Sequence, residues 1–152
     1  MNLEIPQAMK TEHDELHAEL SRLTRAGGRT GEAAKAVAKV LHAHFVKENE
    51  YALPPLSLLV PLSQGRFEPR MAEVLKLTDK LAADMPVMLS EHQDVVAALS
   101  ELTDAATAEN KPEGTAFATM LTAHAQMEEE VTYPTALLIG LYVRNELARG
   151  SR

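Results

Sequence analysis

The sequence of 152 residues contains no cysteine, no tryptophan, and only three tyrosines and three phenylalanines. Without cysteine the chain can form no disulfide, thiolate nucleophile, cysteine-ligated zinc site or iron–sulfur cluster. Any metal ion must therefore be bound by His, Asp, Glu or Tyr. Because aromatic residues are scarce, the core must be mostly aliphatic, and a hydrophobic content of 45% is enough to build one.

Basic residues are also in short supply, since 15 Lys and Arg face 22 Asp and Glu, for a formal net charge of -7. Such a chain repels phosphate backbones and anionic lipids, so we expect neither nucleic acid nor a membrane as a partner. The most apolar stretch, residues 52–62, is too short to cross a bilayer and contains Pro54, Pro55 and Pro61. Residues 1–10 do not contain a basic segment followed by an apolar run, so they do not read as a signal peptide. We therefore expect a cytoplasmic protein.

Sustained alternation of β-branched residues is missing as well, and apolar residues recur instead at spacings of three and four. The sequence therefore predicts an all-α fold in a single domain over residues 1–152. We expect two helix pairs, over residues 6–59 and 85–147, separated by an inserted loop and an extra helix over residues 60–84.

Proline is expected to interrupt two of these helices, because it lacks the amide donor and clashes one turn back. The second helix should kink or end at Pro54. A helical pattern from residue 68 to residue 110 is too long for a small bundle, and Pro86, with Asp84 as a plausible N-cap, is expected to break it.

An internal repeat is the most informative feature of the sequence. Two histidines are each followed by Leu or Val at +3 and by Leu at +7 and +10. Two others are preceded by apolar residues at -7, -4 and -3, and are followed by Glu at +4 and Pro at +10. Offsets of 79 (92 − 13) and 80 (124 − 44) residues relate the two halves, which indicates a duplicated helix pair. The matched residues are His13 and His92, His44 and His124, Glu48 and Glu128, and Pro54 and Pro134.

The repeated His-x-x-x-Glu pairs have the geometry of a metal site. Residues four apart lie on the same face of a helix, about 6 Å apart along its axis, so each pair can hold one ion. Their apolar neighbours place them toward the core, where an unpaired carboxylate costs several kcal/mol. Four neutral imidazoles and two carboxylates carry a charge of -2, which two divalent cations and a bridging oxide or hydroxide would compensate. Imidazole and carboxylate ligands without thiolate suit iron, manganese or zinc.

Taken together, these motifs resemble the hemerythrin-like HHE cation-binding family over residues 6–59 and 85–140. The resemblance implies an up-down-up-down four-helix bundle around a non-haem di-iron centre with an oxo or hydroxo bridge. It further implies binding of O2, NO, peroxide or iron itself. By position, the terminal ligands would be the four histidines and the bridging ligands the two glutamates. The residues that carry the resemblance are His13, His44, Glu48, His92, His124 and Glu128.

The sequence departs from the oxygen-carrying members of that family in two places. Those proteins have a second histidine four residues after the one on the third helix, where this chain has Val96. They also have Asp five residues after the last histidine, whereas here the carboxylate is Glu128, at +4. Both departures argue against a function as a reversible oxygen carrier. His17, four residues after His13, is a candidate for a fifth imidazole ligand on the pseudosymmetric first helix.

We therefore predict a protein that holds two Fe ions, with Mn or Zn as alternatives, and binds O2, NO or peroxide in sensing, scavenging or iron handling. Two other hypotheses stay open. One is a di-iron oxidoreductase that turns over peroxide or NO at the same site. The other is a metal-free helical interaction module whose buried His and Glu only form hydrogen bonds. The remaining glutamates around the motifs, Glu50, Glu129 and Glu130, are expected to form a solvated acidic face.

Overall fold

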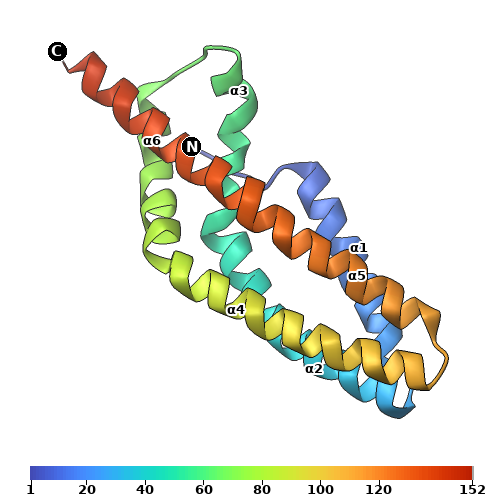
Figure 1. The fold of residues 1–152 in the computed structure, drawn as a ribbon. Helices are drawn as coiled ribbons and strands as arrows, with labels where there is room; N and C mark the ends of the chain where they lie inside the picture. The colour runs from blue at the N-terminus through green and yellow to red at the C-terminus, as the bar shows by residue number, and fades with distance from the viewer. Residues whose placement is uncertain (152) are drawn as a thin grey trace.

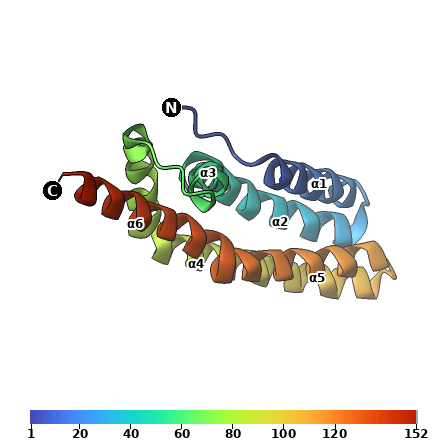
Figure 2. The ribbon, with the colours of Figure 1, turned by 90° about the horizontal axis from the view of Figure 1, so that it is seen from above.

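The computed structural model describes residues 1–151, and over that range it consists of helices and their connections, without a β-strand. Two antiparallel helical hairpins pack side by side (Figures 1 and 2). The all-α prediction is confirmed. The long helices are α1 (Gln7–Thr24), α2 (Gly28–Lys47), α4 (Val74–Ala108), α5 (Pro112–Met127) and α6 (Tyr133–Gly150). None of the described helices is both long and apolar enough to span a membrane.

Two short π-helical segments interrupt the bundle at equivalent places in the two halves. The first, η1 (Glu48–Ala52), follows α2, and the second, η4 (Glu128–Thr132), joins α5 to α6. In each segment the carbonyl of the first glutamate accepts a bond from the amide five residues later. Pro54 and Pro134 are each the second residue after these segments and cannot donate an amide bond, which favours this wider turn. The regular second helix therefore ends before Pro54, as predicted.

The expected break at Pro86 is wrong, because α4 runs without interruption for 35 residues, roughly 52 Å. Pro86 bends the helix instead, and the green N-terminal part of α4 turns away from its yellow part in Figure 1. Leu81 and Met88, one on each side of the proline, are both fully buried against α6 and its surroundings. This continuous burial favours a kinked helix over two separate ones.

Consequently, no separate bundle-length helix is inserted between the two pairs. The segment expected to hold it contains the five-residue α3 (Leu59–Ser63), a short 3-10 helix η3 (Pro69–Glu73) and the first turns of α4.

Two hydrophobic clusters fill the bundle, one at each end. The first joins Leu16 and Leu41 to Leu99 and Leu121, near the hairpin loops. The second gathers around Tyr133 and the buried residues of η1, η2 (Pro54–Leu58), α4 and α6. In α1, α4 and α5 the predicted metal ligands lie in the sequence between residues of the two clusters, and in α2 they lie where the first cluster ends. They therefore form a polar layer inside an otherwise apolar core.

Candidate metal centre

Six of the predicted ligands come together in this polar layer, one from each of several helical turns. Their atoms form two groups, and within each group the potential ligand atoms lie within 4.8 Å of one another. The residues are largely buried, with Glu48 0% and His44 1% exposed. The first group is His44, Glu48, His92 and Glu128, and the second is His13, His124 and Glu128.

Each carboxylate directs its two oxygens toward different histidines. Glu48 Oε1 lies 2.9 Å from His44 Nε2, whereas its Oε2 lies 3.4 Å from His13 Nε2. In the same way, Glu128 Oε1 lies 3.2 Å from His92 Nε2, and its Oε2 lies 3.3 Å from His124 Nε2. A carboxylate that reaches two clusters of imidazoles in this way has the geometry of a ligand shared between two cations.

Two buried polar atoms in the layer have no hydrogen-bond partner, Glu48 Oε2 and His124 Nε2. Leaving a buried donor or acceptor unpaired costs about 1 to 3 kcal/mol, and more for a charged group. Both atoms belong to residues that the duplicated motif provides, and both lie on the His13 side of the layer. A divalent cation would satisfy them, so the residues present fit a metal centre.

A second row of carboxylates orients three of the four imidazoles. Glu91 Oε1 lies 3.2 Å from His44 Nδ1, Glu129 Oε1 lies 2.9 Å from His92 Nδ1, and Glu12 is hydrogen-bonded to His124 Nδ1. Such a bond fixes Nδ1 as the protonated nitrogen and leaves Nε2 free to bind a metal. The arrangement is the usual support of metal-ligating histidines. Glu129 therefore supports the site through His92, although its side chain is 39% exposed, as the predicted acidic face requires.

The duplication explains which histidine lacks such a partner. Glu12 and Glu91 immediately precede the first histidine of each half, and each bonds the second histidine of the other half. The residue equivalent to Glu129 in the first half is Asn49 (129 − 80), which carries no carboxylate. His13 instead stacks its ring on Phe45, with ring centroids 4.3 Å apart. Burial is the main cause that lowers the pKa of His13, so this imidazole favours its neutral form.

The pKa values of the shared carboxylates diverge. Burial, together with the neighbouring Glu128, raises the pKa of Glu48 to about 7. Burial also favours protonated Glu128, but the imidazoles of His124 and His92 close to its oxygens lower its pKa below the ordinary value. His124 loses solvation on burial, yet Glu128 and Glu12 outweigh that loss and raise its pKa to about 9. The two carboxylates are thus stable as a pair only beside a positive charge, which an imidazolium or a metal cation supplies.

Tyr133 is the functional residue that sequence reasoning missed. Its side chain is fully buried, and its hydroxyl donates a 2.6 Å hydrogen bond to Glu48 Oε1. The same hydroxyl lies 3.0 Å from His44 Nε2 and 3.2 Å from His92 Nε2. The equivalent position in the first half (133 − 80) is Leu53, so the two sides of the layer differ. The only signal for Tyr133 in the sequence was its position directly before Pro134. In the structure, Tyr133 follows the π-helical segment η4, and its side chain lies in the core.

The structure does not bring His17 into either group. Its side chain is exposed, and its ring meets that of Phe45 edge-on at a centroid distance of 4.9 Å. Val96, the position of the extra histidine in oxygen carriers, is 43% exposed on α4. The structure therefore places four histidines and two glutamates around the centre, together with one tyrosine.

Comparison with known proteins identifies the family. The sequence matches the hemerythrin HHE cation-binding domain over residues 4–136, which is most of the chain. The protein therefore belongs to the hemerythrin HHE family, in agreement with the bundle, the duplicated motif and the polar layer. Neither curated proteins nor solved structures gave a match.

Proposed function

We propose that this protein is a non-haem di-iron protein, with manganese or zinc as alternative metals. The observation that carries the proposal is the orientation of the Glu48 and Glu128 carboxylates. In each of them, one oxygen faces a histidine of the first group and the other oxygen faces a histidine of the second group. Two cations held by one site would each receive two imidazoles and one oxygen from each carboxylate. A metal-free module is less favourable, because it leaves buried polar atoms unpaired.

The protein residues supply orientation and charge. Glu12, Glu91 and Glu129 hold three imidazoles with Nε2 toward the centre. Tyr133 holds Glu48 by its hydroxyl, and its pKa is raised by burial and by Glu48, so the phenol keeps its proton in the metal-free protein. A bound di-iron pair would supply an exchangeable position and one-electron chemistry for a small ligand.

The space beside the centre is small and admits no bulky ligand. A cavity of about 10 Å³ lies beside His13, His124 and Glu128, close to the lower limit for a single water. Met9 and Leu53 contribute apolar surface to its wall. A small ligand such as O2, NO or peroxide, in sensing, scavenging or iron handling, is consistent with so small a space.

Metal analysis of protein from iron-replete cells tests the proposal. We expect two iron ions per chain and a near-ultraviolet absorption typical of a bridged di-ferric centre. O2 added to the reduced, di-ferrous protein should produce that absorption, and NO added to the di-ferrous protein should give a different spectrum. Less than one metal ion per chain, under iron, manganese and zinc supplementation alike, would refute a dinuclear centre.

A further inference from the structure

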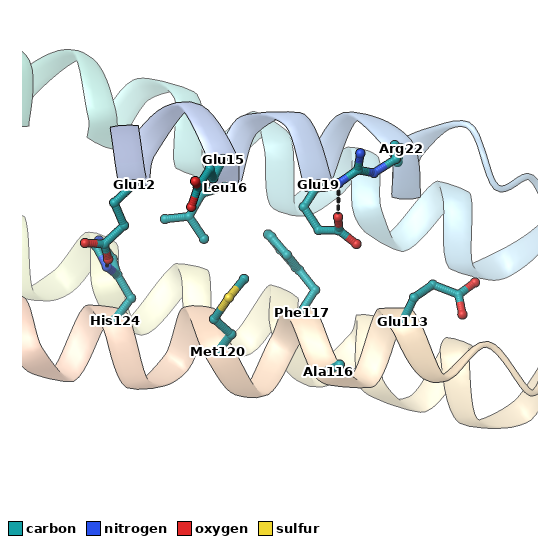
Figure 3. A pocket seen from close by; sticks show the side chains of 10 residues that line it. All are labelled: Glu12, Glu15, Leu16, Glu19, Arg22, Glu113, Ala116, Phe117, Met120 and His124. Carbon is teal, nitrogen blue, oxygen red and sulfur yellow. Dashed lines mark hydrogen bonds and ion pairs between the residues drawn. The ribbon is translucent and has the colours of Figure 1, made fainter. Parts of the chain in front are cut away.

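A groove between α1 and α5 extends along the surface to His124, one of the residues of the candidate metal centre (Figure 3). Its volume is about 540 Å³. The floor is apolar and the walls carry four glutamates, with His124 and Glu12 together at one end. The apolar residues are Leu16, Ala116, Phe117 and Met120, and the charged ones are Glu12, Glu15, Glu19, Glu113 and Arg22.

Three of the carboxylates form a stripe along α1. Glu12, Glu15 and Glu19 are spaced by three and four residues, so they share one face and extend over about 10 Å of the helix. Like charges at this spacing destabilise a helix by a few tenths of a kcal/mol per pair. Only Arg22, at the far end, compensates them, through an ion pair with Glu19. Four carboxylates and one guanidinium sum to -3, and a protonated His124 at the end of the groove brings the charge to -2.

The inner end of the stripe reaches the centre through a single imidazole ring. Glu12 is 45% exposed at its side chain and is hydrogen-bonded to His124 Nδ1. The His124 ring is only 9% exposed, and its Nε2 has no hydrogen-bond partner. That nitrogen lies 3.3 Å from Glu128 Oε2, inside the metal layer. An unpaired ligand atom therefore lies just behind the last carboxylate of the stripe.

The opposite face of the centre is built differently. There the carboxylate that supports His44 is Glu91, and Lys47 neutralises it through a 2.7 Å ion pair. Glu12 has no Lys or Arg partner among the described residues. A cation that approaches the centre is therefore attracted toward the α1–α5 side and meets an ammonium group on the α2–α4 side.

We infer that the groove between α1 and α5 is the route by which divalent metal ions enter the centre. This inference rests on the proposed metal-binding function. A cleft lined by one sign of charge, with walls of low dielectric, concentrates counter-ions and raises their association rate by about ten to a thousandfold. The apolar floor of the groove is such a wall, and it strengthens the attraction between the carboxylates and an approaching cation. Glu12, bonded to His124, is the last carboxylate before the ligands.

The rate of iron uptake tests the route. Chelator-stripped protein is mixed anaerobically with Fe2+ at low ionic strength, and bound iron is counted after quenching with chelator at successive times. The test variant is Glu15→Gln with Glu19→Gln, which removes two charges from the groove. The control is Glu101→Gln with Asp104→Asn, which removes two charges from exposed positions on α4. Both variants change the net charge from -7 to -5 (-7 + 2).

We expect the groove variant to take up iron about five to ten times more slowly than the wild type, with an unchanged final stoichiometry. The control should stay within about twofold of the wild-type rate. Added salt should slow the wild type and reduce its advantage over the groove variant. Equal rates in all three proteins, or equal slowing in both variants, would overturn the route.

A second pair of variants keeps the test independent of acidic residues. Met120→Arg places a cation in the groove, and Val96→Arg places one at a similarly exposed position on α4. Only the first should slow uptake. Failure of the wild type itself to bind iron at equilibrium would refute the metal centre, whereas full binding with unaffected rates would refute the route alone.

Discussion

Replacing Glu48 with glutamine should make the metal-free protein more stable and the metal-treated protein less stable than the wild type. Glu48 is 0% exposed, and its pKa is raised from 4.5 to about 7. Because the pKa of Glu48 is higher in the folded than in the unfolded state, protonated Glu48 contributes to stability. This contribution is fully present below pH 4.5 and is lost as the pH rises through 7. The ionised carboxylate is therefore a cost to the metal-free fold at pH 8.

The size of this cost follows from the shift in pKa. One pKa unit corresponds to about 1.4 kcal/mol, so the change from 4.5 to about 7 is equivalent to about 3 kcal/mol at pH 8. At pH 5 most of the cost is absent, and about 1 kcal/mol is left. Glutamine has the shape of the protonated acid and can still accept the Tyr133 hydroxyl bond. At pH 8 we expect the free energy of unfolding of the metal-free variant to exceed that of the wild type by about 1 to 3 kcal/mol.

Iron should reverse this order, because a ligand that binds only the folded state adds its binding free energy to stability. Glutamine lacks the second anionic oxygen, so the variant should gain little from iron. Urea unfolding of chelator-treated and iron-loaded protein at pH 5 and pH 8 measures both effects. Glu50→Gln, an exposed neighbour that loses the same charge, is the control. A metal-free variant that is less stable at pH 8, or an equal gain from iron in both proteins, would refute the reasoning.

Two other substitutions test the site and the packing around it. His13→Ala should abolish binding of at least one metal ion, whereas His17→Ala, one turn further along α1, should leave the metal content unchanged; equal losses would make His17 a ligand. Gly140→Ala should destabilise the protein by about 1 to 3 kcal/mol, because the added Cβ would lie 2.7 Å from Thr78 Cβ on α4. Gly150→Ala, with open space around it, is its control, and a matching unfolding midpoint for the two variants would contradict the close approach of α6 and α4.

Much of the centre was accessible from the sequence because the duplicated motif is local. The three- and four-residue spacing places each histidine and glutamate on the buried face of its own helix, whatever that helix packs against. The second copy of the motif then specified which residues act together. Glu12 and Glu91 carried a similar signal, since each directly precedes a repeated histidine. Their role was still hidden, because each bonds a histidine of a different helix.

The break predicted from Pro86 failed, whereas the helical periodicity on both sides of it was right. Pro86 is a strong local signal for a helix end, but burial of Leu81 and Met88 in the same cluster favours a continuous, bent helix. Burying a large apolar side chain contributes about 1.5 to 3 kcal/mol, so two such residues can offset the proline. Local propensity was outweighed there by packing that the sequence pattern does not reveal.

By itself, the sequence determined the helical class, the duplication and the side of each helix that carries His and Glu, since these depend on residue spacing along one chain segment. Only the tertiary structure decided which carboxylate oxygen faces which imidazole, that Tyr133 occupies one side of the layer and Leu53 the other, and that an acidic groove opens beside His124. These features depend on the register between helices whose contacting residues are 35 (48 − 13) to 112 (124 − 12) positions apart in the chain. That register is set by how whole helix surfaces interlock rather than by any local pattern.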